Sequence, residues 1–264
     1  MLEIKNLSVR TKTGDWLLQN ISLNLMRGES LGLTGESGAG KTTLIKAIMG
    51  MSQREGNRIS GTIVLDGVDI MHFSEAKRRE LCGRVLGFIP QNPMTAFDLR
   101  LKVGKQMTET FQIRLGLTRK EALSLAESCL AAVNLREAGR VLNAQPAELS
   151  GGMLQRVTVA IMMGLKPVYI LADEPTAALD VDNCRLLLDL LNNQKKEAGI
   201  LMISHDVKAL RRFSSRVLVM EHGEITESGS MDQLICSPKR EWTRQFAQLC
   251  KETQGREWQW RELS

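Results

Sequence analysis

Residues 35–42 read Gly-Glu-Ser-Gly-Ala-Gly-Lys-Thr, which is the complete glycine-rich pattern G-x-x-x-x-G-K-[ST]. A loop of this kind works only between a buried strand and a helix, so it constrains the fold around it. Its glycines let successive backbone N–H groups turn inward around an anion, and the helix that follows directs its positive N-terminal end at the same point. The sequence therefore predicts a strand–loop–helix unit with a phosphate site in the loop.

The residues on either side of this phosphate loop fit that context. Residues 29–34 form a short, mostly apolar run of buried-strand type, and residues 43–49 read as a helix that ends at Gly50. A chance match in a glycine-bearing loop is the alternative, and the flanking segments argue against it. We expect Lys41 to reach the β- and γ-phosphates and the Thr42 hydroxyl to face Mg²⁺. The expected nucleotide-binding residues are Gly35, Glu36, Ser37, Gly38, Ala39, Gly40, Lys41, Thr42 and Thr43.

The composition is that of an ordinary globular protein. The 264 residues are enough for one large α/β domain or for one domain with an insert, and 43% hydrophobic and 25% charged residues argue against disorder. The net charge of +5 is spread along the chain, which favours a solvated basic surface over binding to nucleic acid or an anionic membrane. Five dispersed cysteines without C-x-x-C spacing favour reduced thiols over a metal site or disulfides.

The hydrophobic pattern predicts strands and helices in a mixed order. No stretch approaches the ~18 apolar residues of a membrane span, and the start of the chain alternates like a strand rather than a secretory signal, so we expect a cytosolic chain. Residues 119–133 are apolar at helix spacing, and Thr118 with Glu121 forms a capping-box pattern before them. A hairpin is expected around His222-Gly223, between residues 217–220 and 224–227. Strand-type runs occur at 2–10, 16–25, 61–67, 85–89, 168–171 and 200–204, and a helix is expected near 182–197.

A second motif carries two carboxylates. Residues 168–174 form an apolar strand that ends in Asp173 and Glu174. A carboxylate at the C-terminal end of a parallel strand faces the ligand crevice of an α/β sheet. Asp173 fits the role of holding Mg²⁺ or its waters, and Glu174 that of orienting and deprotonating an attacking water. An Asp-Glu pair alone would be read as a helix N-cap, but the phosphate loop upstream favours the catalytic interpretation.

Residues 149–156, Leu-Ser-Gly-Gly-Met-Leu-Gln-Arg, resemble the LSGGQ signature of ATP-binding cassette (ABC) ATPases. Three other landmarks of that family follow its order: Gln91 resembles the Q-loop glutamine, Asp180 in residues 178–180 the D-loop aspartate, and His205 the switch histidine. The resemblance covers about residues 1–250. It implies an α/β P-loop fold with an N-terminal antiparallel β region, a helical subdomain inserted at about 95–164, a C-terminal helical segment at 230–250, and a tail at 251–264.

The resemblance also implies a mechanism. Two cassettes face each other head to tail, and each ATP lies between the phosphate loop of one cassette and the signature motif of the other. Ser150, Gly151 and Gly152 then serve the partner's ATP, as does the D-loop around Asp180. Gln91 contacts Mg²⁺ or the lytic water, and His205 holds the γ-phosphate. The implied activity is hydrolysis of ATP to ADP and phosphate, with ATP and Mg²⁺ bound at the phosphate loop.

Two positions depart from the family pattern. Met153 stands where the common signature has Gln, a change that some importer subfamilies carry. The aromatic residue on which this family stacks adenine falls near Lys12 here, and the nearest aromatic residue is Trp16. Trp16 is therefore either an adenine contact or part of the core, whereas His72 and His222 match no motif and are expected at the surface.

Two segments resemble the nickel/oligopeptide importer branch of the family. They are residues 149–156 together with 172–176, and residues 237–243, which are similar to a Pro-Lys-His-Pro-Tyr-Thr segment of that branch. The cysteine-rich extension of many peptide importers is missing, with only Cys250 nearby. The resemblance thus implies the short nickel-type subunit, with nickel or a metal–metallophore complex as cargo and a di- or oligopeptide as the alternative.

That branch implies the partners of the chain. They are a second ABC ATPase subunit, expected in a heterodimer rather than a homodimer, two transmembrane permease subunits, and indirectly an extracytoplasmic substrate-binding protein. The expected place is the cytoplasmic face of the cell (inner) membrane, as a peripheral protein. A soluble ABC ATPase acting on nucleic acid and a regulatory nucleotide binder without turnover are weaker alternatives, because the charge is diffuse and the motifs are intact.

Overall fold

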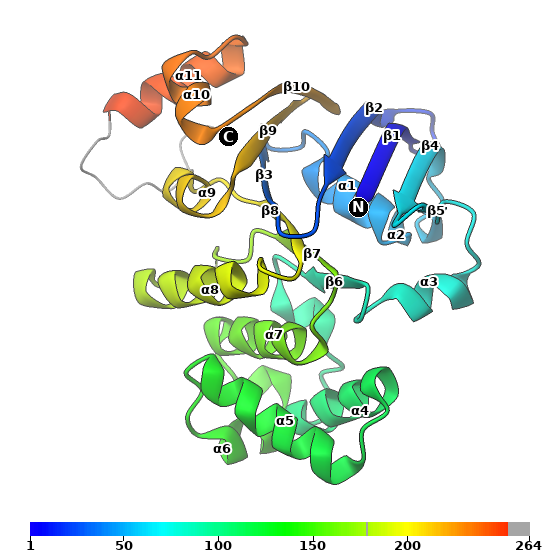
Figure 1. Ribbon diagram of the computed structural model, residues 1–264, viewed down its shortest axis with the longest axis vertical. Coiled ribbons are helices and arrows are strands. Elements are labelled where there is room, and N and C mark those ends of the chain that lie inside the picture. The colour runs from blue at the N-terminus through cyan, green and yellow to red at the C-terminus, as the bar shows by residue number, and fades with distance from the viewer. Residues whose placement is uncertain (178, 253–264) are drawn as a thin grey trace. The chain divides into compact units, whose positions relative to one another are not determined.

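The computed structural model of the chain describes residues 1–177 and 179–252 (Figure 1). The backbone divides into two compact units. One consists of Met1–Arg79 and the chain from Gly199 onward, and the other is Glu80–Ala198. The first unit is thus made from two separate stretches of sequence, whereas the second is a single continuous stretch.

An antiparallel sheet begins the first unit, with the strand order β2-β1-β4-β5. Its strands are β1 Leu2–Arg10, β2 Trp16–Leu25, β4 Arg58–Leu65 and β5 Val68–Asp69. The central strand β1 pairs with β2 on one side and β4 on the other, so Ile4 lies opposite both Leu23 and Ile63. All three of these side chains are buried. The alternating sequence therefore forms a sheet with one apolar face against the core.

Parallel strands hold the phosphate loop in the same unit. β3 Ser30–Gly35 pairs in parallel with β8 Gly199–Ile203 and with β9 Arg216–Glu221, and β9 pairs antiparallel with β10 Glu224–Gly229. Every residue of β3 and β8 is buried, which explains their continuous apolar sequences. The helices of this unit are α1 Lys41–Ile48, α2 Met51–Arg54, α9 Val207–Phe213, α10 Met231–Cys236 and α11 Glu241–Glu252.

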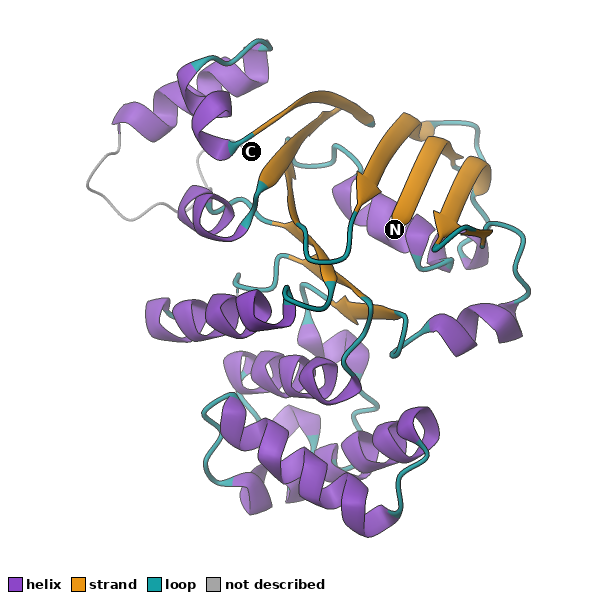
Figure 2. Ribbon diagram, viewed as in Figure 1, coloured by secondary structure: helices purple, strands orange, loops and turns teal. Residues whose placement is uncertain are grey.

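The second unit consists of helices and one parallel strand pair, β6 Leu86–Ile89 with β7 Tyr169–Asp173 (Figure 2). Its helices α4 Val103–Leu115, α5 Arg119–Ala132, α6 Ala138–Asn143 and α7 Gly151–Leu165 pack on one another, and α8 Val181–Gln194 contacts α7. Two short 3₁₀ helices, Pro93–Ala96 and Pro146–Glu148, precede α4 and α7. The helix α3 Glu75–Leu81 connects the first unit to the second along the chain.

The predicted elements agree closely with the observed ones. The α/β class, the antiparallel N-terminal region and the 217–227 hairpin are confirmed, and Thr118 and Glu121 form the predicted capping box at α5. The short helices α2 and α3 were not predicted. The insert at about 95–164 and the other domain boundaries stay predictions, and of the expected tail, residues 253–264 lie outside the described residues. In the part of the chain that is described, no helix is long and apolar enough to cross a membrane.

Candidate functional site

The phosphate loop begins where β3 ends, and its backbone approaches the neighbouring strands very closely. Gly35 has φ +139°, and a Cβ atom added there would lie 1.9 Å from the backbone oxygen of Met220 in β9. Gly40, at the N-cap of α1, has φ +95°, and its Cβ would lie 2.6 Å from the backbone oxygen of Leu17 in β2. Only glycine fits at these two points. The loop is thus held between β2 and β9, which fixes the direction of its N–H groups.

Lys41 is the first residue of α1, and its side chain folds back into the loop. It is only 7% exposed, and its Nζ donates hydrogen bonds to the backbone oxygens of Gly35 (2.8 Å) and Glu36 (2.6 Å). A buried ammonium group needs such acceptors. The next residue, Thr42, is exposed in the first turn of α1. The structure therefore brings one cation and one hydroxyl to the N-terminus of the helix, as the motif predicts.

His205 lies at the same edge of the first unit as the phosphate loop. It follows β8, and the backbone N–H of Ser204 donates to the oxygen of Leu33 in β3 (3.1 Å), so the two parallel strands stay paired to their carboxyl ends. Asp206 then caps α9 by accepting hydrogen bonds from Lys208 N–H and Ala209 N–H. This cap fixes the turn that carries the half-buried His205.

Gln91 and Glu174 meet in the second unit. They follow the paired strands β6 and β7, and Gln91 Nε2 donates a hydrogen bond of 3.0 Å to Glu174 Oε2. Asp173, the last residue of β7, is 3% exposed. Glu174 has φ +44°, a left-handed conformation that is uncommon for a residue with a side chain and that often marks functional sites. Three residues predicted from two separate motifs therefore lie together at the carboxyl ends of two paired strands.

The signature motif forms the start of α7. Ser150 is the N-cap, and its Oγ accepts a hydrogen bond of 3.2 Å from the N–H of Met153. Gly151 is exposed, and a Cβ added there would meet nothing within 4 Å. The first turn of α7 therefore presents backbone N–H groups and the positive end of a 15-residue helix. Met153 does not disturb this start, because the cap uses only its backbone.

Asp180 is the N-cap of α8, and residue 178 before it lies outside the described residues. Its carboxylate accepts hydrogen bonds from the backbone N–H (2.9 Å) and the side-chain amide (2.7 Å) of Asn183. These bonds, together with the nearby positive charge of Arg156, lower the pKa of Asp180. Burial lowers the pKa of the Arg156 guanidinium, and the charge of Asp180 partly offsets this. Asp180 thus stays ionised and is electrostatically coupled to α7.

Trp16 is not part of the core. It is 46% exposed, and the guanidinium carbon of Arg10 lies 3.4 Å from the centre of its ring. Its neighbour Leu17 is the residue whose backbone meets Gly40, so the Arg10–Trp16 pair lies close to the phosphate loop. The interpretation of Trp16 as a core residue is therefore wrong, and its contact with adenine stays a prediction. His72 and His222 are exposed, as predicted.

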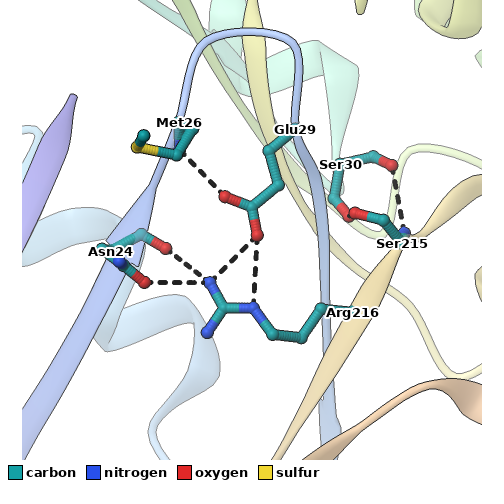
Figure 3. Close-up of polar contacts among 6 residues, drawn as sticks. All are labelled: Asn24, Met26, Glu29, Ser30, Ser215 and Arg216. Atoms are coloured by element: carbon teal, nitrogen blue, oxygen red, sulfur yellow. Dashed lines mark hydrogen bonds and ion pairs between the residues drawn. The ribbon is translucent and has the colours of Figure 1, made fainter.

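A polar cluster at the other end of β3 was not predicted, since no local motif marks it (Figure 3). Arg216 at the start of β9 donates to Glu29 Oε1 through Nε (3.2 Å) and Nη2 (3.0 Å), and Nη2 also donates to the backbone oxygen of Asn24 (2.8 Å). Ser215 N–H donates to Ser30 Oγ in the same region. These contacts join the turn after β2 to the start of β9. They fix the register of the strand pair that holds the phosphate loop.

Comparison with known proteins gives a consistent result. The family model described as ABC transporter matches residues 18–177. The chain is 34% identical over 248 residues to the metal-staphylopine import system ATP-binding protein of Staphylococcus aureus, covering 92% of this chain and 91% of that protein. It is 36% identical over 249 residues to the oligopeptide transport ATP-binding protein of Lactococcus lactis subsp. cremoris, covering 92% of this chain and 74% of that protein.

Two solved structures are also similar. One is a dimeric ATP-binding cassette in a post-hydrolysis state bound to ADP and phosphate, with a TM-score of 0.78, 25% identity, and coverage of 88% of this chain and 99% of that chain. The other is described as the ATP-binding subunit of an ABC transporter, with a TM-score of 0.74, 29% identity, and coverage of 89% and 91%. The glutathione import ATP-binding protein of Escherichia coli is 34% identical over 235 residues, which cover 86% of this chain but 38% of that protein.

Proposed function

Because this chain belongs to the ABC transporter family and is an ATPase that binds ATP with Mg²⁺, we propose that it energises an importer at the cytoplasmic face of the cell (inner) membrane. The observation that carries the proposal is the contact between Gln91 and Glu174 beside Asp173. It supports the proposed roles of Glu174 as the base, Asp173 as a metal ligand and Gln91 as a contact of Mg²⁺ or the lytic water. The similar proteins that this chain covers over 91% and 74% of their length are both named as ATP-binding proteins, one of an import system and one of oligopeptide transport.

The donor atoms that the motif residues supply suit Mg²⁺ and a triphosphate. Thr42 supplies a hydroxyl, Asp173 a carboxylate and Gln91 an amide oxygen, and hard cations of this kind prefer oxygen ligands. Mg²⁺, when bound, neutralises charge on the phosphates. Lys41 and the N–H groups of residues 35–43 would hold the phosphates, and His205 would donate a hydrogen bond to the γ-phosphate.

Glu174 is the proposed general base. Its carboxylate accepts a proton from water as the water oxygen attacks the γ-phosphorus, and the bond from that phosphorus to the β–γ bridging oxygen breaks with its electrons leaving on ADP. The amide of Gln91 orients the carboxylate through the 3.0 Å hydrogen bond. Ser150, Gly151, Gly152 and Asp180 would serve the ATP of a second cassette, which we propose to be a different protein. Two permease subunits and a substrate-binding protein would complete the importer.

The cargo that we propose first is nickel or a metal–metallophore complex, and a di- or oligopeptide is the alternative. The proposal draws on the similarity to the metal-staphylopine import system protein, which is 34% identical over 91% of that protein's length. Membrane vesicles that contain the chain together with the permease proteins encoded by its neighbouring genes should accumulate radioactive nickel in the presence of metallophore. This accumulation should require ATP. Accumulation of labelled oligopeptide instead would favour the alternative.

The ATPase mechanism is tested by Glu174→Gln. This variant should lose at least about 100-fold in phosphate release, because an amide cannot accept the proton of the lytic water. It should also accumulate an ATP-bound dimer in sedimentation velocity. The exposed Glu197, in the turn between α8 and β8, provides a matched control, since Glu197→Gln makes the same chemical change outside the site. Turnover of the Glu174 variant at the wild-type rate would remove Glu174 as the base.

A further inference from the structure

Gln155 joins the helix that begins at the signature motif to the turn that carries Glu174. It lies on α7, five residues after the N-cap Ser150, and is 1% exposed. Its Nε2 donates a hydrogen bond of 3.1 Å to the backbone oxygen of Pro175. Pro175 follows Glu174 directly in the chain. One buried side-chain hydrogen bond therefore connects α7 to the backbone carbonyl of the residue that follows the proposed base.

The backbone at Glu174 depends on where Pro175 is held. Proline fixes its own φ and favours extended backbone with negative φ for the residue before it. Glu174 instead has a left-handed φ of +44°, a conformation that persists only where surrounding contacts hold it. The turn is closed by a hydrogen bond from Ala177 N–H to the oxygen of Glu174 (3.2 Å). Because this backbone is tightly restricted, a displacement of the Pro175 carbonyl moves the Glu174 carboxylate with it.

The chemistry of Gln155 indicates positioning rather than packing. Its other polar atom, Oε1, is buried and makes no hydrogen bond with the described residues. An unsatisfied buried oxygen costs free energy, so an apolar side chain of the same size would fill this place at least as well if volume were all that mattered. The donor to Pro175 is thus the contribution that only the amide makes at this position.

The next residue of α7 is linked to the other end of the same segment. Arg156 interacts electrostatically with Asp180, and its Nη1 donates to the backbone oxygens of Val133 and Asn134 at the end of α5. Between these ends, the Cys184 thiol contacts the backbone oxygens of Thr176 (3.5 Å) and Leu179 (3.7 Å). Pro175 is therefore hydrogen-bonded to α7, and Asp180 is electrostatically coupled to the same helix.

We propose that Gln155 is a positioning residue for ATP hydrolysis. Through its hydrogen bond to Pro175, a movement of the signature end of α7 changes the position of the Glu174 carboxylate. A nucleotide that binds at the N-terminus of α7 would shift this helix, and the same helix is hydrogen-bonded to the Pro175 carbonyl through Gln155. Water activation by Glu174 thereby depends on whether the signature motif of the same chain is engaged. This inference rests on the proposed function, because it assumes that Glu174 is the base and that Ser150–Gly152 bind the nucleotide of a partner.

The test is Gln155→Met in the full chain, which keeps the length and helix propensity of the side chain and removes both polar atoms. We expect kcat for phosphate release to fall about 10–100-fold, because a displacement of about 1 Å in a catalytic group has that effect. KM for ATP should change by less than about 3-fold, because the phosphate loop is untouched. In the Glu174→Gln background, the variant should still form the ATP-dependent dimer.

Thr158 supplies the matched control. It is a buried polar residue on α7, 4% exposed, and among the described residues its Oγ1 donates to the oxygen of Leu154 in the same helix (3.1 Å). Thr158→Val should keep the wild-type kcat. Gln155→Asn is the second variant, since it keeps the amide but is one methylene too short to reach Pro175, and it should lose activity as the Met variant does.

Three results would overturn the inference. The first is a wild-type kcat in either Gln155 variant, and the second is an equal loss of kcat in Thr158→Val. The third is loss of the ATP-dependent dimer in the Gln155→Met, Glu174→Gln double variant, which would place the role of Gln155 at the signature motif itself. Failure of the proposed function looks different, because then the wild-type chain and Thr158→Val also release no phosphate from ATP.

Discussion

Lys41 shows how single residues in this site are placed by backbone atoms. Its ammonium group is buried, and the backbone oxygens of Gly35 and Glu36 accept two of its three protons. The charge is therefore already inside the loop, and a phosphate that enters the loop meets it without a large movement of the side chain. This arrangement depends on the loop keeping its shape, which in turn depends on the glycines that let it pass close to β2 and β9.

Gly35→Ala should destroy that shape. A Cβ at this position would lie 1.9 Å from the backbone oxygen of Met220, so β3 and β9 would have to separate, and we expect a loss of about 3 kcal/mol in the free energy of unfolding. Gly38→Ala is the matched control, because Gly38 also has positive φ (+78°) but open space around it, and should cost about 1 kcal/mol. Urea unfolding measures both values. Equal losses in the two variants would contradict the close contact at Gly35.

The sequence predicts site residues where the residues of a functional group lie close together in a short motif. The phosphate loop, the Asp173-Glu174 pair and the signature motif are short patterns whose residues function near one another in the chain. Gln155 is different: it lies within the segment 149–156, but its partner Pro175 is 20 positions away, and nothing in the motif indicates that contact. Arg216 meets Asn24 across 192 positions, so only the folded chain reveals that contact.

The helix α11 shows how one buried charge places a whole element. Glu227 of β10 is 8% exposed, and its carboxylate accepts hydrogen bonds from the backbone N–H groups of Lys239 (3.0 Å) and Arg240 (2.6 Å), just before α11 begins. Phe246 of α11 is buried and stacks on Trp242, with ring centres 5.2 Å apart. The carboxylate therefore fixes the start of the helix while the aromatic residues bury its apolar face.

This arrangement predicts a pH dependence for the docking of α11. Burial raises the pKa of Glu227, but the Thr243 side chain, the two N–H donors and the charge of Lys239 lower it more strongly, so the net shift is downward from 4.5. A carboxyl group with a depressed pKa contributes stability above its unfolded value, and that stability is lost as the pH falls through the folded value. The free energy of unfolding should thus fall on acidification below about pH 4.5, with a smaller slope in Glu227→Gln. Identical pH profiles would contradict the prediction.

Whole elements were predictable where their periodicity is strong. β1 and β2 run over 2–10 and 16–25 as expected, because their alternation is set by burial on one face. The four residues of α2 are too few to carry a helical period, so nothing in the sequence separates them from a loop. The C-terminal helical segment expected at 230–250 is two helices, α10 and α11, and Pro238 lies in the break between them.

For the molecule as a whole, ligand binding and stability are linked through the first unit. A ligand that binds only the folded state at 100 times its Kd adds about 2.7 kcal/mol to the free energy of unfolding. ATP with Mg²⁺ should therefore raise the melting temperature of the wild-type chain, and Lys41→Ala should abolish this shift. Lys46→Ala is the control, because Lys46 lies on the same helix but pairs with Glu55 at the surface (2.7 Å). Differential scanning fluorimetry measures the change in melting temperature on adding ATP with Mg²⁺. A change in Lys41→Ala equal to that of the wild-type chain would count against the phosphate site.

The class of the fold was predictable because several motifs occur in one order along the chain, each with its own local pattern. The cargo was not, because no residue of this chain is expected to touch it. The sequence predicts an insert at about 95–164, but the division at Arg79 and Gly199 into a discontinuous and a continuous unit does not follow from any local pattern. It depends on pairings such as that of β3 with β8, whose partners are separated by the whole second unit.

The discontinuity of the first unit has a consequence for synthesis on the ribosome. The phosphate loop is among the first segments to emerge, yet its backbone leans against Met220, and Ser30 bonds to Ser215 across 185 positions. At about 5–20 residues per second, the strand that completes the loop follows on the order of 10–40 s later. Meanwhile the second unit, with its short-range helical contacts, is free to fold. A nascent chain that ends before β9 therefore contains the sequence of the phosphate loop but lacks the neighbouring strand that holds the loop in its binding conformation.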